Sequence, residues 1–274
     1  MSSPRRRPAV EVAGSLAVVT GAGSGIGRAT ALLLAERGAR VVAVDLDEPA
    51  AAETARECGG HAEQADVADR LAMEELGRRV LDAHGAPDIL VNNAGVGMSG
   101  RFLDTSPDDW DWILGVNLMG VIHGCQVFGP AMLARRSGHV VNLSSGLGYS
   151  PRATEPAYVT TKAAVLALSQ CLRADWGPSG VGVSAICPGV IDTPIVQSTR
   201  YLGERSNPRD VARIAAVFSR GHAPGLVARA VLGAVEHDRP VVPVGVESHL
   251  GWVLHRLLPT RAVDRLARAK LGGV

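Results

Sequence analysis

The sequence predicts an α/β domain whose doubly wound, mostly parallel sheet has about seven strands and helices on both faces. Short and almost continuous apolar runs alternate with longer helical stretches, and 46% of the 274 residues are hydrophobic. Such runs are typical of parallel strands that are covered on both faces. The expected strands are Leu16–Thr20, Arg40–Asp45, His61–Ala65, Ile89–Asn92, His139–Leu143, Val181–Cys187 and Pro240–Val244.

The stretches between these strands carry recognisable helix ends. Gly38 is expected to end the first helix and Gly85 the third, because glycine readily adopts the backbone conformation that terminates helices. Ser106 is the expected N-cap of the fourth helix, with proline at the first helical position and Asp109 completing a capping-box spacing. No linker rich in Pro, Gly or charge interrupts the pattern, so we expect a single domain.

Composition and charge exclude several classes of protein. The net charge of +1 gives no reason to expect a nucleic-acid partner. No run of about 18 apolar residues occurs, so we expect no transmembrane span. The cysteines lack Cys-x-x-Cys spacing and histidine clusters, so we expect reduced core thiols in a cytoplasmic protein and no metal site. They are Cys58, Cys125, Cys171 and Cys187.

A glycine-rich turn follows the first strand, in the run Thr20-Gly-Ala-Gly-Ser-Gly-Ile-Gly27, and a helix is expected after it. Three of the glycines can provide a tight turn, a close backbone approach to a pyrophosphate and close packing of helix on strand. Free amide groups at the helix start then face the phosphates. The candidate cofactor-binding residues here are Gly21, Ser24, Gly25, Ile26 and Gly27.

An acidic residue stands where the ribose of a dinucleotide would lie. Asp45 ends the second strand, eighteen residues after Gly27, and can bind the adenosine ribose hydroxyls. Its carboxylate would repel a 2′-phosphate, and neither Ser24 nor Leu46 adds positive charge, although Arg28 is close. We therefore expect NAD rather than NADP. The alternative is that Asp45 or Asp47 only caps the next helix, and both could be true.

Asp66 and Val67 follow the third strand, where they can hold an adenine ring. A strand-end aspartate without any ligand is almost as common, so this assignment depends on the others.

Tyr158 and Lys162 lie four residues apart, and Ser145 precedes the tyrosine by thirteen. Residues at this spacing share one helix face, so the ammonium of the lysine can lie beside the phenol. A free tyrosine has a pKa of about 10, and a nearby cation lowers it. The pair could then exchange a proton near neutral pH. An ordinary core tyrosine beside a solvated lysine is the alternative.

Taken in order, these pieces resemble the short-chain dehydrogenase/reductase family in its single-domain, Rossmann-fold form. The resemblance extends from Thr20 to Thr193, and the strand–helix alternation fits to about Val244. The matching pieces are Thr20–Gly27, Asp66, Asn92-Asn-Ala-Gly95, Asn117, Ser145, Tyr158-x-x-x-Lys162 and Pro188-Gly189 with Thr193.

The resemblance implies roles for the candidate catalytic residues. Tyr158 would exchange a proton with the substrate oxygen, while Lys162 would lower its pKa and bind the nicotinamide ribose. Ser145 would hydrogen-bond the substrate oxygen, and its thirteen-residue spacing favours it over Ser144. Asn117 would hold a water in a proton relay, or else only make a buried hydrogen bond.

The resemblance also implies further cofactor contacts. Asn93 would touch the cofactor at the end of the fourth strand, and Gly95 would allow close backbone approach. Thr193 either binds the nicotinamide carboxamide or caps the residues after it. The residues expected around the carboxamide are Pro188, Gly189, Ile191 and Thr193.

The expected function is therefore NAD(H)-dependent interconversion of a secondary alcohol and a ketone. The alternatives are an NADPH-dependent carbonyl reductase and a non-catalytic nucleotide-binding or scaffold protein; an epimerase or dehydratase would usually carry a larger C-terminal domain. The expected substrate is largely apolar, because no carboxylate or phosphate clamp is evident. Its pocket walls are expected at Met98–Phe102, Leu147–Arg152 and 194–225, the last being a lid or a surface segment.

The helix of Tyr158 continues through Ala163–Leu172, which is apolar at eight of ten positions. A helix that is apolar on nearly all sides is covered on nearly all sides. We therefore expect a subunit contact there, in a homodimer or homotetramer, as the family resemblance also implies.

The two ends of the chain differ from the rest. Three arginines in residues 3–8 could begin a twin-arginine signal, but Glu11 interrupts the apolar run that follows. We expect a flexible basic arm over 1–13, the catalytic domain over 14–246 and a basic amphipathic tail over 247–274. The tail either binds a membrane surface or an anionic partner or, as we favour, packs on its own subunit or a neighbour. It carries Leu250, Val253, Leu254, Leu257 and Leu258 beside Trp252, then Arg261, Arg265, Arg268 and Lys270.

Overall fold

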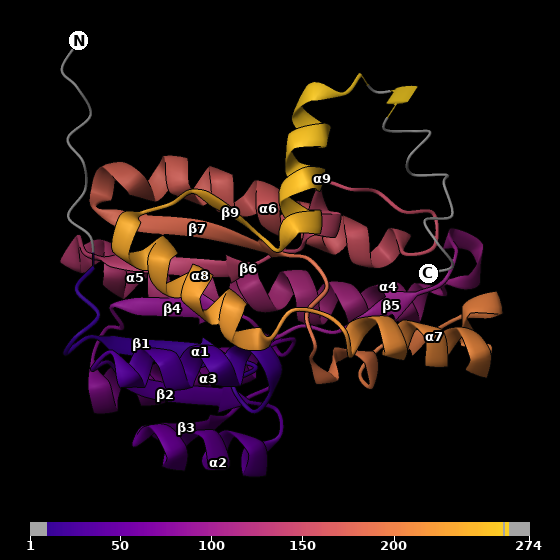
Figure 1. Cartoon of the computed structure of the whole chain (residues 1–274). Coiled ribbons are helices and arrows are strands. Elements are labelled where there is room, and N and C mark those ends of the chain that lie inside the picture. Colours follow the sequence, from indigo (N-terminus) through magenta and orange to yellow (C-terminus); the bar gives the residue numbers. More distant parts are fainter. Residues whose placement is uncertain (1–9, 260, 263–274) are drawn as a thin grey trace.

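The computed structural model describes residues 10–259 and 261–262, and it confirms the predicted fold class (Figure 1). Seven parallel strands form one sheet in the order β3-β2-β1-β4-β6-β7-β9. Every expected strand is present to within one residue at either end. The strands are β1 Leu16–Thr20, β2 Arg40–Asp45, β3 His61–Gln64, β4 Ile89–Asn92, β6 Gly138–Leu143, β7 Val181–Pro188 and β9 Val241–Val244.

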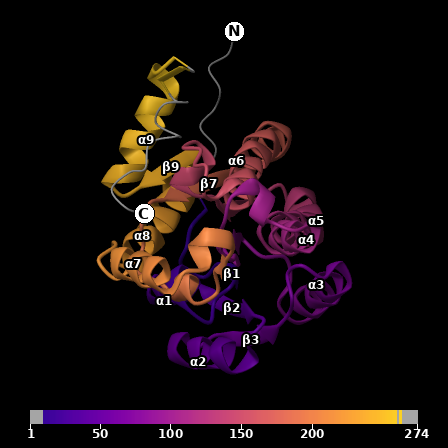
Figure 2. The ribbon, with the colours of Figure 1, turned by 90° about the vertical axis from the view of Figure 1, so that its right-hand side faces the viewer.

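Helices cover both faces of the sheet, as the view along the strands shows (Figure 2). On one face α1, α2 and α8 pack on a core of alternate strand residues, and on the other α3, α5 and α6 do so. The helices are α1 Gly25–Glu36, α2 Glu48–Cys58, α3 Arg70–His84, α4 Pro107–Leu114, α5 Gly120–Arg135, α6 Pro156–Trp176, α7 Pro208–Phe218, α8 Pro224–His237 and α9 Val246–Leu257.

The chain reverses its direction of travel across the sheet between β1 and β4. From β1 it proceeds outward to β2 and β3, and it then returns to place β4 on the other side of β1. In a doubly wound sheet, ligands bind at such a switch point, outside the carboxyl ends of the strands. The segment with α4 and α7 lies beyond these ends (Figure 1).

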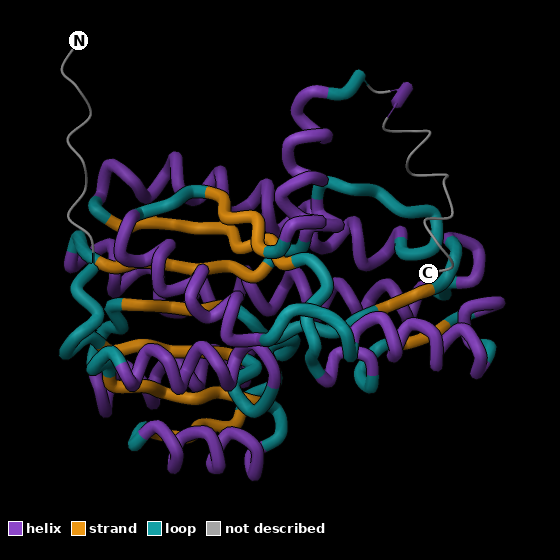
Figure 3. The backbone as a smooth tube through the Cα atoms, viewed as in Figure 1, coloured by secondary structure: helices purple, strands orange, loops and turns teal. Residues whose placement is uncertain are grey.

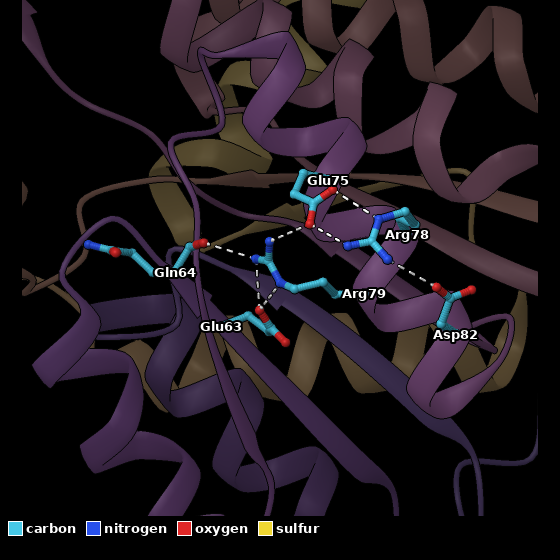
Figure 4. A network of polar contacts seen from close by, with 6 residues as sticks. All are labelled: Glu63, Gln64, Glu75, Arg78, Arg79 and Asp82. Atoms are coloured by element: carbon cyan, nitrogen blue, oxygen red, sulfur yellow. Dashed lines mark hydrogen bonds and ion pairs between the residues drawn. The ribbon is translucent and has the colours of Figure 1, made fainter.

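The edge strand β3 is mostly polar and largely exposed, and side chains of α3 cover part of it. Arg79 of α3 donates to the carboxylate of Glu63 at 2.9 Å and to the backbone oxygen of Gln64 at 3.4 Å (Figure 4). The neighbouring Arg78 pairs with two carboxylates of its own helix. Charged side chains of this kind keep an exposed edge from pairing with another chain.

Helices α4 and α5 join through a π-helical segment, Gly115–Met119, into one helical run, Pro107–Arg135. By length and composition alone this run could cross a membrane, and the mean hydropathy of its most apolar window is 1.3. It contains no uninterrupted stretch of about 18 apolar residues, so the residue pattern did not indicate it. Half of its most apolar window is buried inside the domain, where Phe128 and Met132 reach the core. In this fold the run is therefore a core helix.

A chain of buried polar contacts links the sheet to α6. The amide of Asn92 on β4 donates to Asn142 on β6 at 2.8 Å, and Asn142 donates to the hydroxyl of Ser169 at 3.0 Å. That hydroxyl donates in turn to the carbonyl of Val165 at 2.7 Å. The two strands and the helix are thus connected by directional bonds as well as by apolar packing.

Two short strands form a second, separate sheet, the small orange segments beyond the main sheet in Figure 3. They are β5, Met98–Ser99, and β8, Arg200–Tyr201, and they pair in parallel. The guanidinium of Arg200 also stacks on Trp112 at 3.9 Å and pairs with Asp109 at 3.0 Å. These contacts hold part of the expected lid, residues 194–225, against α4.

The beginning of the expected tail is helix α9, which packs on the turn after β6. The Trp252 and Tyr149 rings lie 5.1 Å apart, and the tyrosine hydroxyl donates to the backbone oxygen of Ser248 at 2.9 Å. The outer face of the helix leaves Leu250 and Leu257 more than half exposed. The basic residues Arg265, Arg268 and Lys270, and the arm over residues 1–9, lie outside the described residues.

Candidate active site

The glycine-rich turn between β1 and α1 is held against the end of β4. Asn93 donates from its side chain to the backbone oxygens of Thr20 at 2.9 Å and Gly21 at 3.1 Å. A Cβ at Gly27 would overlap the Gly21 oxygen, and one at Gly21 would lie 2.8 Å from the Cα of Ala94. The turn is therefore so close to its neighbours that only glycine fits, which leaves its outer backbone open to a phosphate.

Asp45 faces this turn from the end of β2. One carboxylate oxygen accepts the Gly23 amide at 2.8 Å, and the other accepts the Asp47 amide at 3.0 Å. The cap of α2 is Asp47, which accepts the Ala50 amide at 3.1 Å, so Asp45 does not serve as that cap. Arg28, the cation nearest the turn in sequence, is paired with Glu57 at 2.5 Å.

Asp66 and Val67 lie at the end of β3, on the wall of the cavity described below. The carboxylate of Asp66 accepts the Ala68 amide at 2.9 Å, and the carbonyl of Val67 lies 2.9 Å from the ring of His123. Both residues are therefore fixed by local contacts and still face the space beside the glycine turn.

Tyr158 and Lys162 stand on one face of α6, and Ser145 follows the end of β6. The lysine Nζ donates to the carbonyl of Leu143 at 3.0 Å and lies 5.8 Å from the centre of the tyrosine ring. The Ser145 oxygen accepts the Leu147 amide at 3.1 Å and lies within hydrogen-bond range of the phenol. Ser144 instead donates to the carbonyl of Lys162 at 2.7 Å, so it points away from the phenol.

The pKa of Tyr158 is shifted in the direction opposite to the expectation from its spacing to Lys162. Burial raises this pKa to about 12; the hydrogen bond with Ser145 lowers it, and the nearby Glu155 raises it further. Burial also lowers the pKa of Lys162 from 10.5 to about 8. The lysine ammonium donates its hydrogen bond to the Leu143 carbonyl. Desolvation of the buried phenol therefore outweighs the lowering of its pKa by the lysine charge.

Asn117 lies within the π-helical segment, where an extra residue per turn changes the direction of side chains. Its amide oxygen accepts the Val96 amide at 2.8 Å, and its nitrogen donates to the Val96 carbonyl at 3.0 Å and to Thr161 at 3.2 Å. The buried hydrogen bonds expected as the alternative to a relay are thus present. A Cβ at Gly95 would lie 3.2 Å from the Asn117 oxygen and 3.4 Å from the Nζ of Lys162.

The segment after β7 returns toward the glycine turn. A Cβ at Gly25 would lie 3.1 Å from the methyl group of Thr193, so the two segments almost touch. Thr193 precedes a short 3₁₀ turn but makes no side-chain capping bond. The Val190 amide donates to Glu247 of α9 at 2.7 Å, which links the tail helix to this segment.

A single cavity of about 1670 Å³ connects these groups. It is lined by every candidate residue except Gly27 and Asn117, which lie behind its wall. The volume exceeds that of an ordinary small-ligand pocket, so a dinucleotide and a substrate can both be placed in it. The glycine cradle at one end and Asp45 beside it fit the pyrophosphate and adenosine ribose of such a cofactor.

The far end of the cavity contains all three expected walls and one that the sequence did not suggest. Met98, Tyr149 and Phe218 each belong to one of the three expected walls and line the cavity. Phe102, the last residue of the first expected wall, is 63% exposed and does not line it. Helix α9 adds a further wall. Its lining residues are Glu247, Ser248, Leu250, Gly251, Leu254 and His255. An amphipathic tail gives no sign of which apolar surface it will meet, so this contribution could not be read from the pattern.

Comparison with known proteins agrees with this geometry. The model of the short chain dehydrogenase family matches residues 15–201. The probable oxidoreductase EphD of Mycobacterium bovis is 42% identical over 276 residues, which cover 97% of this chain but 46% of EphD. The chain thus spans about half the length of that relative. The oxidoreductase UcpA of Escherichia coli is 39% identical over 206 residues, 73% of this chain and 77% of UcpA.

A solved short chain dehydrogenase/reductase from Burkholderia phymatum, in complex with NAD, has a TM-score of 0.81 and 31% identity. The alignment covers 95% of this chain and 97% of that one. The chain belongs to the short-chain dehydrogenase/reductase family.

Proposed function

We propose that the protein interconverts a secondary alcohol and a ketone with NAD(H) as the hydride carrier. The observation that carries the proposal is the single cavity that contains both the glycine cradle and the Ser145–Tyr158–Lys162 group. Bound nicotinamide supplies the hydride acceptor or donor. Lys162 would hold its ribose, and Pro188, Gly189, Ile191 and Thr193 would surround its carboxamide.

The chain's own residues would manage the proton and the substrate oxygen. Ser145 would donate a hydrogen bond to that oxygen and support the charge that develops there. Burial raises the pKa of Tyr158 to about 12, so the phenol is protonated at neutral pH and holds the proton that a ketone oxygen would receive. Fast transfer would require this pKa to move toward the working pH in the reacting complex. Asn117 would hold a water molecule in a proton relay to Lys162.

The decisive test is a panel of alcohols and ketones followed by NADH absorbance. Wild type is compared with Tyr158→Phe, which removes only the phenolic oxygen. Glu204→Gln, an exposed position outside the cavity, is the matched control. Loss of turnover only in Tyr158→Phe supports the assignment, whereas unchanged turnover in that variant contradicts it.

Two features support NAD over NADP. Asp45 places a carboxylate beside the Gly23 amide, and Arg28 is engaged by Glu57 and so is not available to a 2′-phosphate. Titrating both cofactors against wild type and Asp45→Ser tests this. We expect tighter NAD binding in wild type and a reduced preference in the variant. Tighter NADP binding by wild type would overturn the cofactor assignment.

We further propose a cytoplasmic homodimer or homotetramer. Its catalytic domain, expected over 14–246, is proposed to include α9 as well, because that helix lines the cavity. The outer face of α6 supports a subunit contact, because the small residues Ala167 and Cys171 are exposed there, beside the exposed Gln170. The exposure of Cys171 also corrects the expectation that all four cysteines are core thiols. Light scattering at micromolar concentration tests the assembly, and a monomer would contradict it.

A further inference from the structure

The cavity wall next to Tyr158 carries polar side chains from two distant parts of the chain. Glu155 stands immediately before α6, and Tyr201 belongs to β8; both line the cavity. Because β8 pairs with β5, Tyr201 is held beside Ser99, whose hydroxyl accepts a hydrogen bond from Arg205 at 3.1 Å. This corner, formed by Glu155, Tyr201 and Arg205, is called the polar corner below.

Each member of the polar corner has a buried atom without a hydrogen-bond partner among the described residues. The atoms are Oε2 of Glu155, the hydroxyl of Tyr201 and Nη2 of Arg205. The Thr199 side chain lies near the Tyr201 hydroxyl, so the carboxyl oxygen of Glu155 is the more exacting of the two cavity groups. Within the described part of the chain, only one other buried side-chain atom shares this condition, on Asn92 in the sheet. Buried polar atoms are nearly always paired in folded proteins. Two of these residues, Glu155 and Tyr201, line the cavity and Arg205 lies behind them, so their unpaired atoms indicate a binding function.

The position of Glu155 strengthens this argument. It occupies the N-cap of α6 with an extended φ of −141°, yet its side chain makes no capping bond. The same chain caps α3 with Asp69 and α4 with Ser106, which are residue types favoured for capping. The glutamate is therefore a poor cap, and its carboxyl group is instead part of the cavity wall.

The charges around the corner limit what it can bind. Burial raises the pKa of Glu155, and the positive charges of Arg152 and Arg205 oppose this shift. The corner holds charges of both signs, so it favours neither an anionic nor a cationic group of the substrate. A neutral hydroxyl both donates and accepts, so it can satisfy a carboxyl oxygen and a phenol together.

We propose that Glu155 and Tyr201 bind a hydroxyl group of the substrate, which is therefore a hydroxyketone or a diol. The proposal rests on the proposed function, because Tyr158 must act on the neighbouring carbonyl or alcohol. Glu155 precedes Tyr158 by three residues, a spacing that makes them neighbours on a helix. The bound hydroxyl accordingly lies close to the reacting carbon.

Apolar side chains also line the cavity outside this corner, among them Ile195, Val196, Phe218 and Leu254, although polar residues such as Gln197 and His255 stand beside them. The substrate is thus amphipathic: an apolar body with a hydroxyl beside its carbonyl. This sharpens the expectation of a largely apolar substrate that the sequence alone supports.

Matched ketone pairs test the proposal. Acetoin is compared with butanone, and α-hydroxyacetophenone with acetophenone, by NADH consumption with wild type, Glu155→Gln, Tyr201→Phe and the exposed control Glu204→Gln. A site built to bind a substrate hydroxyl discriminates strongly against the analogue without it. We expect wild type to prefer the hydroxylated member by about tenfold or more in kcat/KM, a difference of one good hydrogen bond.

In Glu155→Gln and Tyr201→Phe the ratio of the two kcat/KM values should fall by about tenfold, mainly through KM of the hydroxylated member. Glu155 also acts on the pKa of Tyr158, so the ratio and not the absolute rate is the readout. Glu204→Gln should behave as wild type. Equal kcat/KM for both members in wild type, or a preference that survives both substitutions, overturns the proposal.

A binding measurement separates this proposal from the proposed function. Trp112 lines the cavity, so ligand binding can be followed by tryptophan fluorescence in Tyr158→Phe, where no turnover is expected. Stronger binding of the hydroxylated member, lost when Glu155→Gln is added, supports the polar corner even if no ketone of the panel is reduced. Equal binding of both members refutes it, whatever the activity of Tyr158.

Discussion

Replacing Lys162 with Met is expected to abolish turnover and yet stabilise the fold at neutral pH. The lysine is 5% exposed, and the only hydrogen bond of its ammonium to a described residue is to the Leu143 carbonyl. Its pKa falls from 10.5 to about 8 on burial. Since one pKa unit corresponds to about 1.4 kcal/mol, the charged form is disfavoured in the folded state by about 3 kcal/mol.

The sign follows from the lowered pKa. Below pH 8 the lysine is charged in both states and the whole penalty is present. As the pH rises from 8 to 10.5, the folded protein loses the proton first, and the penalty disappears. Methionine fills a similar volume but leaves the Leu143 carbonyl without a donor, at a cost of about 1–2 kcal/mol.

The net gain at pH 7 is therefore about 1–2 kcal/mol, or a rise in Tm of about 2–6 °C for a domain of this size. Thermal unfolding followed by circular dichroism at pH 7 and pH 10 measures it for wild type and Lys162→Met. Arg70→Met is the control, because Arg70 pairs with Glu74 on an exposed helix face and should change Tm little.

The advantage of Lys162→Met over wild type should shrink or reverse at pH 10. A variant that is less stable than wild type by several degrees at pH 7, or a difference that is the same at both pH values, would refute the reasoning.

Three further changes probe other parts of the fold. Gly27→Ala places a methyl group against the Gly21 oxygen, so NAD titration should show at least about tenfold weaker binding, whereas Gly233→Ala, with open space around it, should bind normally. Glu57→Gln releases Arg28 and should tighten NADP binding without affecting NAD; unchanged NADP binding would count against the argument. Trp252→Ala should cost about 2 kcal/mol in urea unfolding, because the ring packs on Tyr149.

The strands could be predicted almost to the residue because each is a compact apolar run that the sheet buries on both faces. Even the small errors have local causes. β9 begins at Val241 rather than at Pro240, whose nitrogen has no hydrogen to donate to a ladder. The candidate site could also be located, since the i, i+4 spacing of Tyr158 and Lys162 puts both on one helix face.

What could not be predicted depends on contacts between distant segments. Spacing alone places Lys162 beside the phenol of Tyr158, but only the fold shows that desolvation dominates the pKa of both. The π-helical segment around Asn117 is a change in backbone hydrogen bonding without a marker in the residue pattern. Glu155 and Tyr201 are 46 positions apart and lie on one cavity wall because β8 pairs with β5 and the Gly100 amide donates to the Thr154 carbonyl.

The buried bonds that join Asn92, Asn142 and Ser169 have a consequence for how α6 is aligned. A helix resting on aliphatic side chains alone can rotate or slide slightly at little cost, whereas hydrogen bonds have a preferred length and angle. Ser169 lies eleven residues, about three turns, after Tyr158. The orientation of the Tyr158 phenol toward a reacting carbon is therefore set in part by these buried hydrogen bonds. Losing them would lower the catalytic rate before it lowered the stability of the fold.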